Sequence, residues 1–246
     1  MQLFHTIGLY FIFLGKVFSR PEKRWIYYRE TVKEIDKLGI NSIGIIAIIS
    51  FFMGAVITIQ TAYNTENPFL PTYLIGVAAR DSILLEFSST IVALILAGKV
   101  GSNIASEIGT MRVTEQIDAL EIMGVNSANF LVLPKITALV LFNPFLTILS
   151  IAVGIFGGWI VGVYAGVITT QEYIDGIQYV FYPYYITYAI IKTIVFAFII
   201  TSVSSFYGYY VEGGSLEVGR SSTKAVVYSS VVVLLFNLIL TQLLLS

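Results

Sequence analysis

The hydrophobic positions fall into five long apolar stretches separated by shorter polar or aromatic segments. A helix needs about twenty apolar residues to cross a hydrocarbon core of roughly 30 Å, and each stretch reaches that length. We predict membrane-spanning helices at residues 41–61, 83–105, 136–169, 185–207 and 224–245. The pattern therefore predicts an all-α integral membrane protein, in which residues 41–246 form a single five-span domain.

The first forty residues follow a different pattern. Residues 1–18 are apolar but lack the positive start and the small-residue cleavage site of a secretory signal peptide, so we expect them to be retained. After them, opposite a charged face, apolar side chains recur at helical spacing at Trp25, Tyr28, Val32, Ile35 and Leu38. We interpret residues 1–40 as an N-terminal interfacial elbow region with an amphipathic helix at the membrane surface. The alternative is a helix packed against a protein partner.

The third predicted span is too long for a helix that crosses the membrane upright. Its roughly 34 residues cover about 50 Å, so we expect it to tilt, to bend at Pro144 or to project from the membrane. Small residues form one stripe at Gly158, Gly162 and Gly166 and another at Gly101, Ala105 and Gly109. Such stripes let two helix backbones approach closely, and packing within the chain and homodimerisation are both compatible with them.

The composition supports this assignment and excludes several functions. Hydrophobic residues make up 57% of the chain and charged residues 12%, against about 25% charged residues in soluble domains. The net charge of -1 provides no basic surface for nucleic acid. The chain has no cysteine and a single histidine, His5, which excludes disulfides, thiol chemistry and a histidine-rich metal site.

The distribution of lysine and arginine predicts the orientation. Twelve of the fourteen lie in the N-terminal region, around the second-to-third connection, or in the fourth-to-fifth connection. Because cytoplasmic loops carry the excess of these residues, we place the N-terminus in the cytoplasm. Five spans then put the C-terminus in the periplasm of a multi-pass inner-membrane protein.

A polar segment between the second and third spans, residues 107–124, interrupts the apolar pattern. We predict a helix of about three turns there, capped by the Thr114 hydroxyl and ended by Gly124. Glu115 and Asp118 would complement the positive end of its dipole, and Ile117 would lie on its apolar side. Held between two spans, such a helix would act as a rigid lever. A solvated loop helix is the alternative.

The same stretch closely resembles the signature of the MlaE/YrbE permease family. Residues 97–125 read AGKVGSNIASEIGTMRVTEQIDALEIMGV. The matching residues are Ala97, Gly98, Gly101, Ser102, Glu107, Gly109, Met111, Arg112, Thr114, Glu115, Gln116, Asp118, Ala119, Leu120, Met123, Gly124 and Val125. Lys99 replaces the common arginine, and Ser127 stands where many members have proline. A second match covers residues 218–231, and weaker ones cover residues 54–60 and 191–197.

The resemblance implies a homodimeric permease of an ABC-type lipid transporter, moving phospholipid or a related lipid between membranes. It further implies a cytoplasmic ATPase that uses the ATP, an MCE-domain protein on the far side, and neither a cofactor nor a catalytic residue in this chain. In the family, the short helix after the second span couples to the ATPase. The candidate ATPase-coupling residues are accordingly Arg112, Thr114, Glu115, Gln116, Asp118 and Glu121, with Arg220 as a second contact. Glu107 is interpreted as structural.

Three polar residues within spans are candidates for the lipid path: Glu86, Gln60 and Lys192. Ionisable groups at membrane depth are costly and usually face a cavity or a partner. Glu86 matches the carboxylate of the family's RELGP-like motif, but Leu85 and Ser89 replace its arginine and proline, and Arg80 is a possible substitute for that arginine. Lining the lipid path, structural pairing and interfacial exposure all remain open for Glu86. For Lys192 the strongest alternative is snorkelling to the outer surface.

Two other classes of protein fit the sequence less well. A stand-alone secondary transporter or channel often shows internal repeats, and none is visible. An intramembrane enzyme needs paired acids or an activated nucleophile at membrane depth, and no such group is present. Residues 214–221, GSLEVGRS, resemble a phosphate-binding loop, but Arg220 replaces its lysine and the segment joins two spans rather than following a buried strand. We therefore expect no nucleotide there.

Overall fold

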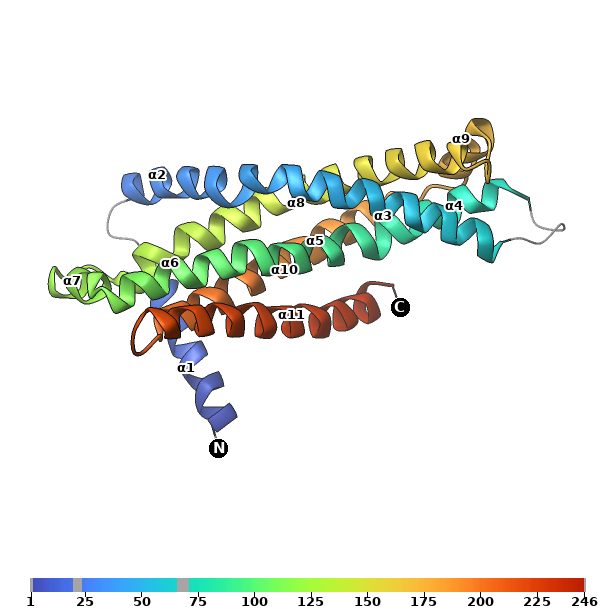
Figure 1. Cartoon of the computed structure of the whole chain (residues 1–246). Helices are drawn as coiled ribbons and strands as arrows, with labels where there is room; N and C mark the ends of the chain where they lie inside the picture. Colours follow the sequence, from blue (N-terminus) through green and yellow to red (C-terminus); the bar gives the residue numbers. More distant parts are fainter. Residues whose placement is uncertain (1, 20–23, 66–70, 246) are drawn as a thin grey trace.

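The computed structural model describes residues 2–19, 24–65 and 71–245, and all regular secondary structure in these residues is helical. The long helices form an elongated bundle, and α1 leaves it at a steep angle (Figure 1). The α-helices are α1 (Gln2–Val17), α2 (Arg24–Glu34), α3 (Ile43–Asn64), α4 (Tyr73–Ser82), α5 (Val92–Leu96), α6 (Ser102–Val113), α7 (Gln116–Ile122), α8 (Ser127–Tyr164), α9 (Thr170–Gln178), α10 (Tyr184–Tyr209) and α11 (Ser215–Leu245). Between them lie the π-helices η1 (Ile35–Gly39), η3 (Ile83–Ile91) and η4 (Ala97–Gly101) and the 3₁₀-helix η2 (Ile40–Ser42).

The prediction of five membrane-length helices is confirmed within the described residues. They cover Trp25–Asn64, Tyr73–Val113, Ser127–Tyr164, Tyr184–Tyr209 and Ser215–Leu245. All five begin before the predicted spans, because a helix that leaves the hydrocarbon core can continue with polar residues and the same backbone hydrogen bonds. The third helix ends earlier than predicted, at Tyr164 instead of residue 169. Gly166 follows it with a φ of 71°, in the left-handed conformation that ends many helices.

The N-terminal region runs directly into the first span. Helical backbone hydrogen bonds continue through η1 and η2, so the predicted boundary at residue 40 lies inside one continuous helix. One side of α2 contacts α8, where the Tyr27 hydroxyl lies 2.6 Å from the Thr137 hydroxyl. The aromatic side chains of Trp25 and Tyr28 on the predicted apolar face are exposed. The surface location of this segment stays a prediction, whereas its partner inside the chain is α8.

Glycines bring α3 and α8 into backbone contact. A Cβ placed on Gly54 would lie 1.8 Å from the Gly154 carbonyl oxygen, and one on Gly157 would lie 2.3 Å from the Phe51 carbonyl oxygen. Gly158 and Gly162, which belong to the predicted stripe, both face Thr58 of α3. The stripe therefore serves packing within the chain. Gly166 is not part of it, because it lies in the turn after α8.

The second predicted stripe meets α10 and α11. A Cβ on Gly101 would lie 2.8 Å from the Ser204 hydroxyl, and one on Gly208 would lie 2.8 Å from the Ala105 carbonyl oxygen. Gly109 faces Val218 at the start of α11. Small residues on both helices thus let α10 run through the middle of the bundle, against α6, α8 and α11.

The connections separate into two groups at opposite ends of the bundle. The start of α2, the α6–α7 segment and the turn between α10 and α11 lie at one end (Figure 1). The start of α4, α9 and the C-terminus lie at the other end. Five consecutive spans require this grouping, because successive connections alternate between the two ends of the bundle. The connections that are rich in lysine and arginine all lie at the α7 end.

Candidate functional site

The polar segment between α6 and α8 contains a helix shorter than predicted. Helix α7 has seven residues, and α6 extends to Val113 before it. The Thr114 hydroxyl donates to the Thr110 carbonyl oxygen at 2.8 Å, so the prediction that Thr114 caps α7 is wrong. That hydroxyl instead adds a second hydrogen bond to the Thr110 carbonyl oxygen, which already accepts from the Thr114 amide at 3.0 Å. Glu115 occupies the capping position with a φ of 60°.

The predicted end of α7 is confirmed. Gly124 has a φ of 79°, and its amide donates to the Glu121 carbonyl oxygen at 2.9 Å. The Val125 amide donates to the Leu120 carbonyl oxygen at 3.0 Å. These two bonds use carbonyls that the helix leaves unpaired, and glycine adopts this backbone conformation at little cost.

Side-chain bonds fasten α7 to the bundle. Arg112 Nη1 lies 2.6 Å from Asp118 Oδ1, which ties the end of α6 to α7. The hydroxyls of Tyr209 and Ser127 donate to Glu121 Oε1 at 2.8 and 2.9 Å. These bonds, with that from Tyr209 the larger effect, lower the pKa of the Glu121 carboxyl. Three candidate coupling residues thus hold α7 in place.

The remaining surface of α7 is available to a partner. Glu115 and Gln116 are exposed, and Gln116 donates to the Thr114 hydroxyl at 3.0 Å. Ile122 is 87% exposed and Met123 is 68% exposed, so an apolar surface lies beside the polar one. Sequence reasoning named Met123 only as a match to the family signature and did not name Ile122, although two large apolar side chains after Glu121 are a detectable signal in a polar segment. Exposed apolar patches of this kind mark protein interaction sites.

An internal ion-pair network supports the same end of the bundle. Lys135 on α8 is buried, and its Nζ lies 2.6 Å from Glu34 Oε1 and 2.8 Å from Glu107 Oε2. Lys37 pairs with the same Glu107 oxygen at 2.8 Å. The network joins the first, second and third long helices, as a structural role for Glu107 requires. Arg220, the second predicted contact, is exposed at the start of α11 and pairs with Glu217 at 2.6 Å.

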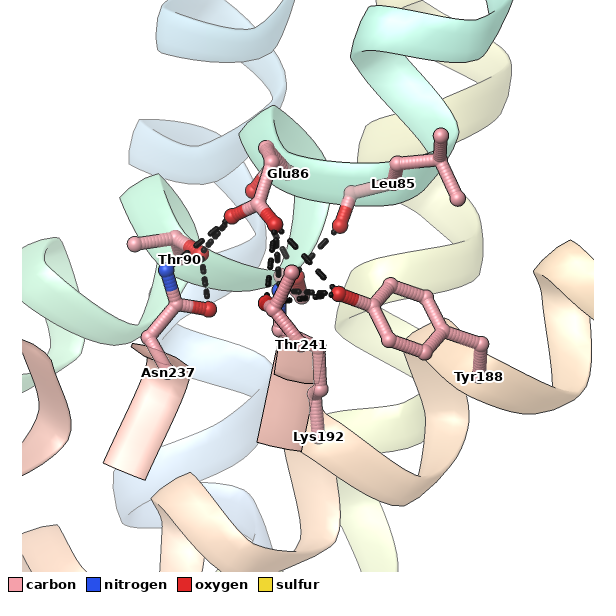
Figure 2. A network of polar contacts seen from close by, with 8 residues as sticks. Leu85, Glu86, Thr90, Tyr188, Lys192, Asn237 and Thr241 are labelled. Carbon is pink, nitrogen blue, oxygen red and sulfur yellow. Dashed lines mark hydrogen bonds and ion pairs between the residues drawn. The ribbon is translucent and has the colours of Figure 1, made fainter. Parts of the chain in front are cut away.

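The structure brings together two of the three predicted lipid-path residues. Lys192 Nζ lies 3.0 Å from Glu86 Oε1 and also donates to the Tyr188 hydroxyl and the Leu85 carbonyl oxygen (Figure 2). The Lys192 side chain is fully buried, so the snorkelling alternative is wrong. The Glu86 carboxylate and the Lys192 ammonium compensate each other's charge. A buried ammonium requires such a partner, because an unpaired charge inside the bundle would be costly.

Glu86 also joins η3 to α11. Asn237 Nδ2 donates to Glu86 Oε2 at 3.0 Å, and the Thr241 hydroxyl donates to Oε1 at 3.2 Å (Figure 2). Thr90, on the following turn, donates to Oε2 at 3.2 Å. Sequence reasoning missed Asn237 and Thr241. Their signal is a pair of polar side chains four residues apart in an otherwise apolar helix, and hence on one face.

This polar cluster, formed by Glu86, Lys192, Tyr188, Asn237 and Thr241, borders a cavity of about 480 Å³. Glu86, Asn237, Thr241 and Gln242 provide its polar lining, and leucines of α11 provide the apolar part. The Glu86 side chain is 39% exposed and is therefore accessible from the cavity. A cavity with apolar walls and a few convergent polar groups is typical of ligand sites.

The other two residues considered for this region lie elsewhere. Gln60 is exposed on α3 and is not among the residues that line the cavity. Arg80 is buried and donates to the carbonyl oxygens of Ile177 and Tyr179 at 2.8 and 2.7 Å. Arg80 thus anchors the end of α9 and does not replace the family's missing arginine beside Glu86.

These features define a multi-pass α-helical membrane protein with a fixed surface helix at one end and a polar cavity near the other. The chain belongs to the MlaE permease family, because the family described as Permease MlaE matches residues 31–243. It is accordingly a permease of the ABC-transporter type.

Curated relatives agree with this assignment. A probable ABC transporter permease protein of Rickettsia bellii is 34% identical over 99% of this chain and 93% of its own length. The intermembrane phospholipid transport system permease protein MlaE of Haemophilus influenzae is 34% identical over 94% of this chain and 88% of its own. The chloroplastic protein TRIGALACTOSYLDIACYLGLYCEROL 1 of Arabidopsis thaliana is 32% identical over 94% of this chain and 66% of its own.

Proposed function

We propose that this chain is the membrane subunit of a transporter that moves phospholipid between membranes, driven by a separate ATPase. The match to the MlaE family over residues 31–243 carries the proposal, and the phospholipid cargo follows the named Haemophilus relative. Two copies of the chain would form the permease, with an MCE-domain protein at the periplasmic end. ATP would bind to the ATPase, and this chain would need no cofactor of its own.

Helix α7 is the proposed contact with the ATPase. It is short, is held by Arg112, Asp118 and Glu121, and exposes Glu115 and Ile122 away from the bundle. Because α6 and α8 flank it directly, a displacement of α7 would move both long helices. Arg220 at the same end would provide a second contact.

Two substitutions on the exposed surface of α7 test this contact: Glu115→Lys reverses a charge, and Ile122→Asp introduces one. Glu115→Lys and Ile122→Asp should each reduce co-purification of the ATPase at least tenfold, because both positions would be buried in the interface. Asp118 is a poorer target, since its replacement breaks the internal pair with Arg112. The matched control is Asp175→Lys, an exposed charge reversal on α9 at the opposite end.

The control should retain the ATPase at the wild-type level. Unchanged co-purification in both Glu115→Lys and Ile122→Asp would refute the role of α7. That result would not bear on the proposed phospholipid cargo, which is tested by the lipid extraction described next.

The cavity beside Glu86 is the proposed part of the lipid path. Its polar cluster can contact a headgroup, and its leucines can contact acyl chains. Mass spectrometry of lipids extracted from the purified complex tests this assignment. Phospholipid should co-purify, and its amount should fall in Leu238→Trp, which fills the cavity. Transport by the chain alone without ATP would instead support a stand-alone secondary transporter or channel.

A further inference from the structure

A second cavity lies at the opposite end of the bundle from the Glu86 cavity, between α1, the end of α10 and the start of α11. Its volume is about 430 Å³. The lining includes Tyr207 and Tyr210 from α10, Glu212 from the turn, and Glu217 and Lys224 from α11. None of these five residues takes part in the cluster around Glu86 or in the bonds that hold α7.

The wall formed by α1 is fixed to the rest of the protein. The Tyr10 hydroxyl lies 2.7 Å from the Ser202 hydroxyl, and the Phe13 ring centroid lies 5.2 Å from that of Tyr209. Beyond them, Asn129 Nδ2 donates to the Val17 carbonyl oxygen at 2.6 Å. The elements that line the open cavity therefore pack on one another.

Aromatic rings gather at this cavity. The Phe206 and Tyr210 centroids are 5.1 Å apart, and the Tyr207 ring stacks on Tyr228 at 5.1 Å with an interplanar angle of 13°. Aromatic groups of this kind bind organic cations such as quaternary ammonium and alkylammonium groups. They therefore favour a ligand with an amine at one end.

The charges around the cavity balance. Glu212 and Glu217 provide two carboxylates, and Lys224 provides an ammonium. Arg220 pairs with Glu217 at 2.6 Å, so that carboxylate is already neutralised. Glu212 and Lys224 then remain as one negative and one positive group. A ligand of a single charge would be attracted by one of them and repelled by the other, whereas a zwitterion satisfies both.

An apolar track leads away from the cavity. Along α11, Tyr228, Val231 and Leu235 follow Lys224 at spacings of four, three and four residues, and so lie on one face. They are 48%, 50% and 56% exposed. A membrane helix presents such a face to acyl chains or to another helix. The combination of a zwitterionic cavity and an apolar track matches a molecule with a polar head and hydrocarbon tails.

We propose that this cavity binds the headgroup of a zwitterionic phospholipid from the adjacent leaflet. The amine would lie beside Glu212 and the aromatic rings, the phosphate beside Lys224, and an acyl chain along α11. The site is separate from the Glu86 cavity. It rests on the membrane location of the chain and not on the proposed cargo.

Native mass spectrometry of the purified full-length chain in detergent tests the proposal. The probes are short-chain phosphatidylethanolamine, short-chain phosphatidylglycerol and free phosphoethanolamine, the last of which lacks acyl chains. Glu212→Gln should weaken binding of phosphatidylethanolamine about three- to tenfold, because this lipid carries the amine. It should retain or strengthen binding of phosphatidylglycerol, because the anionic headgroup loses a repulsive carboxylate. Lys224→Gln should weaken both lipids by a similar factor, because both carry the phosphate.

Asp175→Asn, an exposed carboxylate at the opposite end, is the matched control and should bind both lipids as wild type does. Retained binding of phosphatidylglycerol by Glu212→Gln also shows that this variant is folded. Wild-type binding of both lipids by Glu212→Gln and Lys224→Gln would overturn the proposal. Binding of free phosphoethanolamine as tightly as the lipid would also overturn it, because the ligand would then be a soluble zwitterion.

Discussion

Lys192 shows how a single charged residue is accommodated inside this bundle. Its side chain is fully buried, and its ammonium meets Glu86, the Tyr188 hydroxyl and the Leu85 carbonyl oxygen. Desolvation of an ammonium is costly unless an opposite charge and hydrogen bonds compensate. Each residue of the pair is therefore tolerated because of the other, and the sequence separation of the two residues conceals that dependence.

Removing only one member of this pair should destabilise the protein. Glu86→Gln leaves the Lys192 ammonium without its carboxylate, and we expect a loss of about 3 kcal/mol in the free energy of unfolding, because the cost of an unpaired buried charge is about 3–5 kcal/mol and Glu86 is partly exposed. The double variant Glu86→Gln with Lys192→Met should recover part of that loss. Unfolding in mixed micelles measures the free energy of unfolding of the single variants and of the double variant. If the loss in the double variant equalled the sum of the losses in the single variants, Glu86 and Lys192 would not be coupled.

Glu121 gives a pH dependence of stability. Hydrogen bonds from Tyr209 and Ser127 lower the pKa of its carboxyl in the folded protein relative to the unfolded chain. Its contribution is therefore present above the unfolded pKa, about 4.3, and is lost as the pH falls through the folded pKa. At pH 7 the free energy of unfolding of the wild-type protein should be higher than that of Glu121→Gln by less than about 1 kcal/mol, because the Glu121 side chain is exposed. This difference in the free energy of unfolding should become smaller as the pH falls below about 4. Thermal unfolding midpoints that differ between the two proteins by the same amount at every pH would contradict this prediction.

At the scale of elements, glycine decides which helices meet. Gly54 lets α3 approach the Gly154 backbone of α8 so closely that no Cβ fits there, and Gly208 lets α10 approach the Ala105 backbone of the second long helix in the same way. In lipid, where the hydrophobic effect does not drive helices together, such close packing is a main source of stability. The sequence revealed two small-residue stripes, but a stripe does not specify its partner.

The contrast between two glycines of α3 tests this packing. Gly54→Ala would place a Cβ 1.8 Å from the Gly154 carbonyl oxygen, and backbone cannot yield easily, so we expect a loss of about 3 kcal/mol or failure to fold. Gly44 has open space around it, and Gly44→Ala should be neutral or stabilise by up to about 1 kcal/mol. Thermal unfolding in detergent compares the two. If Gly54→Ala and Gly44→Ala changed the stability by the same amount, the contact between Gly54 and Gly154 would not be tight.

At the scale of the whole molecule, the two ends of the bundle differ in charge and in structure. The α7 end contains the ion-pair network around Lys135 and the zwitterionic cavity, whereas the other end contains α9 and opens toward the Glu86 cavity. The prediction from lysine and arginine places the α7 end in the cytoplasm.

Cysteine labelling tests that orientation, and the absence of native cysteine provides a clean background. Single cysteines at Glu115 on α7 and at Asp175 on α9 occupy exposed positions at opposite ends. A membrane-impermeant maleimide should label Asp175→Cys in intact spheroplasts and Glu115→Cys only after permeabilisation. The reverse pattern would contradict the predicted orientation, and with it the docking of a cytoplasmic ATPase at α7.

The amino-acid sequence alone was sufficient to predict the number of long helices, the membrane class and the family. Those properties depend on hydrophobic length and on local motifs, which are encoded along the chain. It also identified Glu86 and Lys192 as exceptional, because charge at membrane depth is costly.

How these parts combine became known only from the folded chain. The pairing of Glu86 with Lys192, the bonds from Asn237 and Thr241, and the contact of Gly54 with Gly154 each join residues about 100 or more positions apart. Local pattern cannot specify such contacts, since helix packing is set by complementary shape and charge on two surfaces. The bond from Tyr209 to Glu121, which joins α10 to α7 across 88 positions, depends on the tertiary structure in the same way. The shorter length of α7 has a local cause, because the Thr114 hydroxyl bonds back to Thr110 of α6.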